Sequence, residues 1–221
     1  MQPPDFSIII PTRNRHQQLG MCLKAIACLD YPANSFEVII VDDGSKEPPA
    51  AVADMYNSRF AVKLLVQQNK GAAGARNTGA NQACGKFLAF TDDDCTPDSK
   101  WLQALATRFS KGGDIAIGGR TINALHDNLY SAASQYIHDR VYTHYNTDHD
   151  NAKFFASNNL AMPRALFHSI GGFDIALFPG ASEDRDLCSR SVPLLCHRKP
   201  RTRLLQHRPI SKPSPEGKAR G

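Results

Sequence analysis

Short apolar runs alternate with segments of helical spacing along the first half of the chain. Four of the runs are predicted to be buried strands, at residues 6–10, 36–41, 62–66 and 87–90. Between and after them, apolar residues recur on one side of a helix, which predicts helices at residues 16–29, 48–56, 75–84 and 98–109. This alternation predicts an α/β fold, a Rossmann-like and mostly parallel sheet with helices on both faces.

The pattern is less regular in the second half of the chain. Strands are predicted at residues 115–122 and 154–162, the second of them interrupted by the polar sequence Ser157-Asn158-Asn159. Helices are predicted at residues 127–142 and 164–170. A further helix begins after Ser182, its expected N-cap, with acidic residues in its first turn.

Composition adds a broad class to this picture. With 42% apolar and 21% charged residues among 221, the chain is typical of a globular protein. No signal peptide is visible, and no apolar run approaches the roughly 20 residues that a membrane span needs. The six cysteines form no C-x-x-C pair. These features together predict a cytoplasmic protein with reduced thiols.

Charge divides the chain into two parts. From Ser189 onward there are nine lysines and arginines and one acid, whereas residues 1–188 have a net charge of −3. We therefore expect a folded domain at residues 1–190 and a basic, proline-rich, poorly ordered tail at residues 191–221. A change of reading frame near Ser191 is one explanation of the tail. A basic segment that holds the protein at the cytoplasmic face of an anionic membrane is the other. The mildly acidic remainder argues against a nucleic-acid partner.

Three consecutive carboxylates, Asp92, Asp93 and Asp94, follow the strand at residues 87–90. Adjacent carboxylates repel one another unless a cation or protons neutralise them, so a divalent metal that holds a phosphorylated ligand is the first interpretation. The alternative is a helix N-cap, with Asp94 or Thr96 capping the helix that follows.

Other polar residues follow neighbouring strands. Arg13 comes after the first strand, and Asp42 and Asp43 end the second. Because parallel strands place their carboxyl ends at one edge of a sheet, these residues and the carboxylate triplet are expected to gather there.

Five separated motifs and the segment before the last of them resemble the family 2 glycosyltransferases, which have the GT-A fold. They are PTRNR (11–15), VIIVDDGS (38–45), GAAGARNTG (71–79), FTDDD (90–94), NNLAMPRALFHSIGGFD (158–174) and SEDRDLCSR (182–190). The resemblance implies transfer of a sugar, with inversion, from a nucleotide diphosphate donor (usually UDP or dTDP) to an acceptor hydroxyl. It also implies a need for Mn or Mg. A carbohydrate or lipid-linked acceptor in cell-surface polysaccharide or glycolipid synthesis would fit such an enzyme.

The resemblance implies a role for each motif on the donor side. Asp43 looks like the contact to the donor nucleotide, and Pro11, Thr12 and Arg13 would line the same pocket. Gly71 and Gly74 would let the backbone approach the ligand, and Arg76 suits a diphosphate contact. Each motif alone has a simpler interpretation: Asp42-Asp43-Gly44 as a turn, and Arg76 as a solvated helix residue.

The resemblance also implies a metal and a base. Asp92–Asp94 would be the D-x-D motif, with Asp94 as the direct metal ligand, and His207 is a candidate further ligand. Asp184 resembles the general base, with Glu183 as the substitute, and a nearby acidic cluster should raise the pKa of Asp184. The simpler interpretation of this pair is complementation of the helix dipole.

Several alternatives stay open. Trp101, Asn158, Asn159 and Phe173 are candidates for the acceptor side, although Trp101 and Phe173 also suit a plain core. The sequence after Arg190 departs from the family, so an inactive, truncated remnant that binds sugar nucleotides is one alternative. Asp92-Asp93-Asp94-Cys95-Thr96 also fits the D-x-D-x-T motif of a phosphatase, although three predicted strands precede it.

Overall fold

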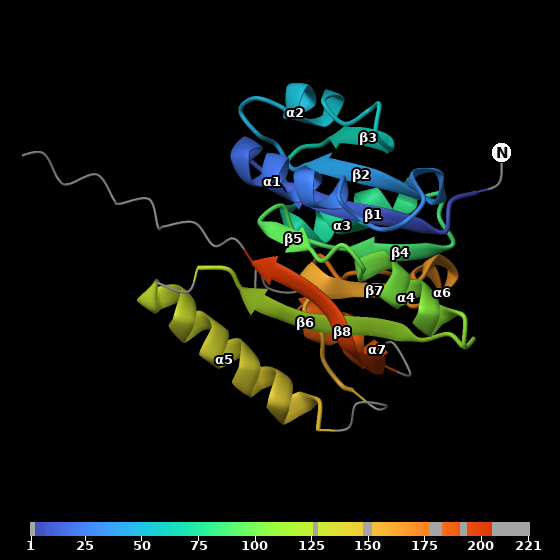
Figure 1. Cartoon of the computed structure of the whole chain (residues 1–221), viewed down its shortest axis with the longest axis vertical. Helices are drawn as coiled ribbons and strands as arrows, with labels where there is room; N and C mark the ends of the chain where they lie inside the picture. Colours follow the sequence, from blue (N-terminus) through green and yellow to red (C-terminus); the bar gives the residue numbers. More distant parts are fainter. Residues whose placement is uncertain (1–2, 126–127, 148–151, 177–182, 191–193, 205–221) are drawn as a thin grey trace, which may run out of the picture.

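The computed structural model describes residues 3–125, 128–147, 152–176, 183–190 and 194–204. Seven α-helices and eight strands are assigned in these ranges (Figure 1). The strands are β1 (Phe6–Thr12), β2 (Phe36–Asp42), β3 (Ala61–Val66), β4 (Phe87–Phe90), β5 (Cys95–Pro97), β6 (Ala116–Asn123), β7 (Leu160–Pro163) and β8 (Leu194–Leu204). The helices are α1 (His16–Ile26), α2 (Ala50–Asp54), α3 (Gly71–Asn81), α4 (Trp101–Phe109), α5 (Leu129–Tyr145), α6 (Arg164–Ser169) and α7 (Glu183–Arg190).

All eight strands form one sheet in the order β3-β2-β1-β4-β7-β6-β8-β5. Strands β3, β2, β1 and β4 are parallel, as the alternating sequence pattern predicts. The direction changes at β7, which runs antiparallel to both β4 and β6. The sheet is thus a parallel half that carries the predicted strand ends, continued by a mixed half.

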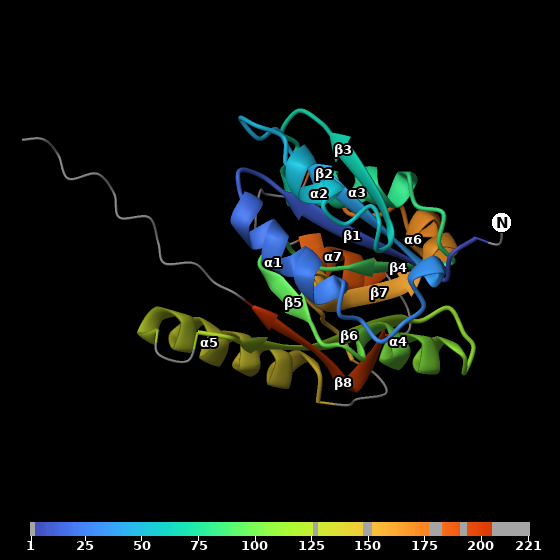
Figure 2. The ribbon, with the colours of Figure 1, turned by 45° about the horizontal axis from the view of Figure 1, so that its top comes forward.

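Alternate residues of the central strands face two separate cores. Ile8 and Ile10 of β1 pack with α1, α2 and α4, whereas Ile9 packs on the other face with α3, α6 and α7. The predicted layers of helices on both faces are therefore present (Figure 2). Helix α5 lies apart from these layers along β6, as both ribbon views show.

Three elements of the structure differ from the sequence prediction. Residues 154–159 are not a strand: Ser157–Asn159 form a buried 3₁₀ turn, and only Leu160–Pro163 joins the sheet. The helix predicted at residues 75–84 begins four residues earlier, because α3 starts at Gly71, which has a positive φ of 77°. Strand β5 has three residues, too few for a periodic pattern to reveal.

Strand β8 lies in the tail that we expected to be poorly ordered. It pairs in parallel with β6 and antiparallel with β5, because β6 offers a free edge on the side away from β7. Its pairing with β6 shifts register between Cys196 and Arg201, so Pro200, which has no N–H to donate, falls in the irregular stretch. Residues 194–204 are thus assigned as a strand within the predicted tail. The predicted boundary at residue 190 stays a prediction, and Ser182, His207 and residues 205–221 lie outside the described ranges.

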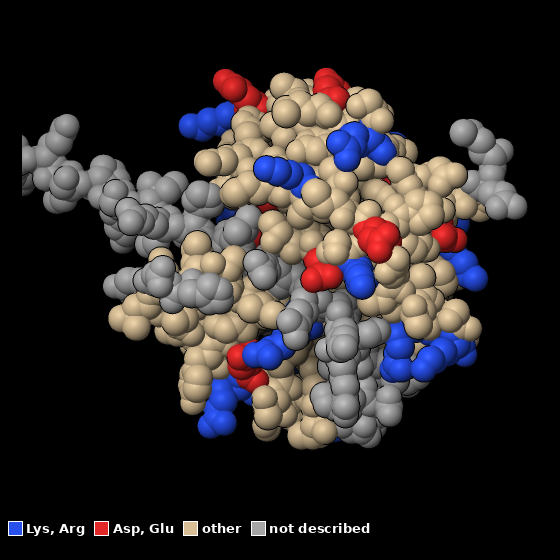
Figure 3. Space-filling model, in the orientation of Figure 1, with Lys and Arg blue, Asp and Glu red and all other residues tan. Residues whose placement is uncertain are grey.

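The surface of the described residues is mixed in charge. Basic and acidic side chains are interspersed over the face shown in Figure 3. Within the described ranges, no helix has the length and apolar content to cross a membrane.

Candidate functional site

The carboxyl ends of β1, β2 and β4 meet at a cavity of about 460 Å³. This is the edge where the order of strands in a parallel sheet places ligands. Eight of the residues expected at the donor and metal site line the cavity, together with three that the sequence did not single out. They are Pro11, Thr12, Arg13, Asp43, Gly71, Arg76, Asp92 and Asp93, with Arg15, Asn69 and Ala72.

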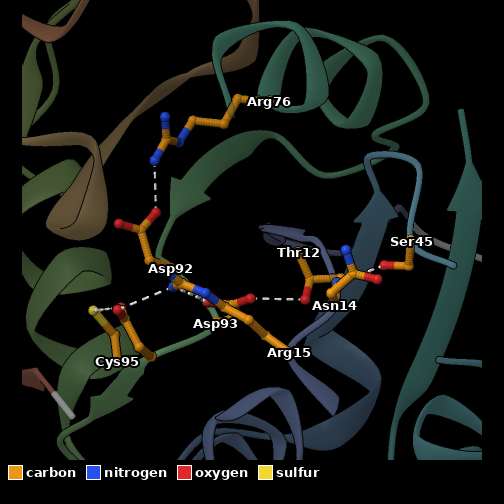
Figure 4. A network of polar contacts seen from close by, with 9 residues as sticks. Thr12, Asn14, Arg15, Ser45, Arg76, Asp92, Asp93 and Cys95 are labelled. Atoms are coloured by element: carbon orange, nitrogen blue, oxygen red, sulfur yellow. Dashed lines mark hydrogen bonds and ion pairs between the residues drawn. The ribbon is translucent and has the colours of Figure 1, made fainter. Parts of the chain in front are cut away.

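The carboxylate triplet is held by two arginines (Figure 4). Arg76 donates from Nη2 to Oδ1 of Asp92 at 2.6 Å. On the other side, Nη1 of Arg15 lies 3.1 Å from Oδ1 of Asp93 and 3.3 Å from Oδ2 of Asp94. Thr12 donates from Oγ1 to the second oxygen of Asp93 at 2.7 Å. Three carboxylates therefore share two guanidinium groups.

Burial and the crowding of negative charge raise two pKa values in the triplet. Burial, together with repulsion from Asp92 and Asp93, raises the pKa of Asp94 to about 6, although Arg15 opposes the shift. Burial also raises the pKa of Asp93, against the hydrogen bond from Thr12 and the charge of Arg15. An additional cation at the triplet would relieve this repulsion.

The interpretation of Asp94 or Thr96 as a helix cap is wrong. Strand β5 follows the triplet, and α4 begins later, at Trp101, with Lys100 as its N-cap. Asp98 accepts the backbone N–H of Lys100 at 3.0 Å in the turn before that helix. The triplet thus ends a strand and does not start a helix.

Arg76 is not a solvated helix residue. Its side chain is 5% exposed, and its guanidinium lies 5.7 Å from the ring centre of Phe173. Burial lowers its pKa, but the charges of Asp92, Asp184 and Glu183 raise it by more, so the group stays cationic. Arg76 therefore lies between the triplet and the acidic start of α7. Its Nε has no hydrogen-bond partner among the described residues.

Asp184 is a buried carboxylate with one oxygen engaged and one unengaged. Its Oδ2 accepts the backbone N–H of Ser157 at 3.0 Å, in the 3₁₀ turn that interrupts the predicted strand. Its Oδ1 is buried and has no hydrogen-bond partner within the described ranges. Burial raises the pKa of Asp184, and Arg76 opposes that shift. Asp184, Glu183 and Asp94 are not among the residues that line the cavity.

Asp42 has the structure expected of a plain turn, whereas Asp43 lies where a contact to the donor nucleotide is expected. Asp42 makes the turn, accepting from both the backbone N–H and the hydroxyl of Ser45. Asp43 faces the cavity but already holds the loop before α3. Its Oδ1 accepts from Gln67 Nε2 at 2.7 Å and from the backbone N–H of Lys70 at 2.8 Å, and its Oδ2 accepts from the backbone N–H of Gly71 at 2.9 Å.

The candidate acceptor residues lie mainly in the core. Trp101 is fully buried and donates from Nε1 to Oδ1 of Asn159 at 3.0 Å, which supports the plain-core interpretation. Phe173 is 2% exposed, and Asn158 accepts from the hydroxyl of Thr121 at 3.1 Å. Trp101 and Phe173 are therefore core residues, and Asn158 and Asn159 are tied by hydrogen bonds to other elements.

The triplet suits a hard divalent cation in its chemistry. Its carboxylate oxygens are the ligand type that Mg²⁺ and Mn²⁺ prefer. Among the described residues, no three histidine, cysteine or acidic side chains converge as a complete metal site. A cation held by one or two carboxylates, with substrate phosphates and water as the other ligands, is the usual arrangement for Mg²⁺. The triplet fits such a partial site.

Arg15 is the main residue that sequence reasoning missed. It lies in the PTRNR segment, two positions after Arg13, and it is the N-cap residue of α1. An arginine beside a helix start is usually solvated, so only the folding of β1 against β4 reveals its carboxylate partners.

Comparison with known proteins places this geometry in a family. The model of glycosyl transferase family 2 matches residues 7–171, which is more than half of the chain. The glycosyltransferase AglE of Haloferax volcanii is 33% identical over 135 residues, which are 60% of this chain and 44% of AglE. The chain thus spans less than half of the length of that relative.

Two solved structures show the fold. Staphylococcus aureus TarS 1–349 in complex with UDP-GlcNAc has a TM-score of 0.73 at 18% identity, covering 93% of this chain and 60% of TarS. The mannosyltransferase PcManGT of Pyrobaculum calidifontis, in complex with GDP-Man and Mn²⁺, has a TM-score of 0.72 at 19% identity, covering 92% and 57%. The GT-A fold expected from the sequence is confirmed, and together with the matched family model it shows that this chain belongs to glycosyl transferase family 2.

Proposed function

We propose that this protein transfers a sugar from a UDP- or dTDP-sugar to an acceptor hydroxyl, with inversion at the anomeric carbon. The observation that carries the proposal is the position of Arg76. It pairs with Asp92 of the triplet at 2.6 Å and experiences the charge of Asp184, so it connects the donor cavity to a buried carboxylate. A cation there suits a diphosphate, and a carboxylate beyond it suits an acceptor hydroxyl.

Each group then has a chemical task. Arg76 and the backbone at Gly71 would bind the diphosphate, and Pro11, Thr12, Arg13 and Asp43 would surround the nucleoside. Asp92 and Asp94 would hold a Mn²⁺ or Mg²⁺ ion, which stabilises negative charge on the departing diphosphate. The unengaged Oδ1 of Asp184 would take the proton of the acceptor hydroxyl. The hydroxyl oxygen then bonds to the anomeric carbon from the side opposite the breaking bond to phosphate.

Two solved structures of this fold support a sugar nucleotide as the donor. TarS is known with UDP-GlcNAc, and PcManGT with GDP-Man and Mn²⁺, so neighbours of this fold hold sugar nucleotides with different bases. Synthesis of a cell-surface polysaccharide or glycolipid, at the cytoplasmic face of a membrane, is part of the same proposal and rests on the resemblance and the basic tail.

Isothermal titration tests the donor site directly. UDP and dTDP are titrated into the full chain with and without MnCl₂, and metal-dependent binding of one of them is the expected result. Absence of binding by both nucleotides would overturn the proposal. Binding without any hydrolysis or transfer of the sugar would instead indicate an inactive remnant. Release of phosphate from p-nitrophenyl phosphate, abolished by Asp92→Asn, would favour the phosphatase alternative.

The Asp184→Asn variant tests the proposed base. Asparagine retains an oxygen for the N–H of Ser157 but does not accept the hydroxyl proton, so sugar transfer should fall by roughly 10²- to 10⁴-fold. Affinity for the nucleotide should change little, because Asp184 does not line the donor cavity. Glu183→Gln is the matched control and should retain most of the activity. If Asp184→Asn turned over normally while Glu183→Gln did not, Glu183 would be the base.

A further inference from the structure

The two arginines at the triplet differ in how firmly they are held. The side chain of Arg76 is 5% exposed, whereas that of Arg15 is 51% exposed. An ion pair with a half-exposed partner is weak, since water and salt compete for it. The contact of Arg15 is thus the one that an incoming cation can replace.

Arg15 bridges two carboxylates, as a bound cation could. A single nitrogen, Nη1, contacts one oxygen of Asp93 and one of Asp94, at 3.1 and 3.3 Å. These two oxygens come from different carboxylates and converge on one positive group. A hard metal ion binds carboxylate oxygens that converge in this way.

The carboxylate that Arg15 contacts does not depend on Arg15 for its position. Thr12 holds the other oxygen of Asp93 at 2.7 Å, and the side chain of Asp93 is 4% exposed. Loss of Arg15 would therefore leave the carboxylate of Asp93 in place. The side chain of Arg15 also lines the cavity beside Arg13 and Arg76, so it has space to turn towards a ligand there.

We propose that Arg15 is a displaceable counter-ion of Asp93 and Asp94. It neutralises the pair while the donor site is empty, gives way to a divalent cation, and then contacts the diphosphate in the cavity that it lines. This inference rests on the proposed donor and metal site. Arg15 then has two opposed effects: it competes with the metal for the carboxylates, and it strengthens binding of the nucleotide.

Calorimetry on the full chain separates the two effects. MnCl₂ alone is titrated into the wild type, Arg15→Gln and Arg15→Lys, and UDP is then titrated at saturating Mn²⁺. Removal of an ion pair of this exposure should tighten Mn²⁺ binding by about threefold in Arg15→Gln. Loss of a charge-assisted hydrogen bond should weaken UDP binding by about tenfold or more. Arg15→Lys keeps the positive charge but lacks the planar guanidinium group. Its affinities for Mn²⁺ and UDP should therefore lie between those of the wild type and Arg15→Gln.

Arg13→Gln is the matched control. It removes the same charge from the same cavity, but the hydrogen bond of Arg13 goes to the carbonyl oxygen of Gly44, so Mn²⁺ affinity should change less than in Arg15→Gln. If Arg15 had only a structural role, Arg15→Gln would weaken the binding of both Mn²⁺ and UDP. Unchanged or weaker Mn²⁺ binding by Arg15→Gln, with normal binding by the wild type, would overturn this inference alone. If the wild type and all variants failed to bind Mn²⁺, the metal site of the proposed function would fall with it.

Discussion

Burial governs the acid–base behaviour of the key carboxylates more than their sequence neighbours do. The sequence predicts a raised pKa for Asp184 because acids lie nearby, and the direction is confirmed. The cause differs, since desolvation dominates and Glu183 contributes the least of the causes. Burial depends on how α7 packs against the 3₁₀ turn at Ser157, which no pattern of charges along the chain reveals. For the triplet, by contrast, adjacency in sequence already implies the mutual repulsion.

Asp94 should make the protein less stable as the pH rises. Its pKa is about 6 in the folded protein against 3.8 for an ordinary aspartate, so between these values the folded state holds a proton that the unfolded state has lost. Stability due to this group is therefore complete below pH 3.8 and falls up to about pH 6.

The Asp94→Asn variant removes this titration. The free energy of unfolding of the variant minus that of the wild type should be about 2–3 kcal/mol larger at pH 7 than at pH 4. The reason is that each unit of difference between the folded and unfolded pKa corresponds to about 1.4 kcal/mol. Urea unfolding at several pH values, without metal, measures the difference. A difference that stays constant with pH would contradict the raised pKa.

The pattern of apolar residues accounts for the elements that the sequence predicts well. Helix α1 has a buried face of regular spacing, and strands β1, β2 and β4 are apolar runs buried almost throughout. Their predicted positions agree with the structure to within a few residues. The elements that the sequence does not predict form for other reasons. Strand β5 is defined by its partner β8, and the turn at Ser157–Asn159 is held by contacts with distant residues such as Trp101. Such contacts depend on the tertiary fold.

Strand β6 depends on a glycine for its packing. A Cβ atom at Gly118 would lie 1.9 Å from Cγ of Phe155, a fully buried ring. Gly118→Ala should therefore destabilise the protein by about 1–3 kcal/mol, as overpacking of a core commonly does. Thermal unfolding measures the effect.

Gly20→Ala in α1 is the matched control for that substitution. There the nearest atom to a new Cβ is a side-chain carbon of Val52 at 3.8 Å, which is ordinary contact. Replacement of a helical glycine by alanine should raise stability by up to about 1 kcal/mol. Equal behaviour of the two variants would contradict the packing argument at Gly118.

The whole molecule joins a parallel half, which the sequence predicts, to a mixed half, which it predicts only in part. All the residues predicted to bind the donor belong to the first half or to loops at its edge. The second half depends on β8, whose basic and proline-containing sequence suggests a tail and not a strand. Composition misleads there because the free edge of β6 supplies the hydrogen bonds that order the segment.

Truncation tests whether β8 is part of the folded domain. A chain that ends at residue 190 would expose the edge of β6 and remove the strand that β5 pairs with. It should unfold at a lower temperature than the full chain and aggregate more readily. A chain that ends at residue 204 retains β8 and is the control. If the shorter chain had the stability of the longer one, the domain would end at residue 190, as the sequence predicts.

The hydrogen bonds of Asp43 limit how it can recognise a nucleotide. An ionised carboxylate has about four lone-pair sites, and the loop before α3 already occupies three of them at Asp43. One site, on Oδ2, remains for a ligand. A base that donates one N–H to Asp43 can use the remaining site without disturbing the loop. A base that donates two would first have to break one of the hydrogen bonds between Asp43 and the loop. Discrimination between nucleotides would then depend on the number of donors on the edge of the base that faces Asp43.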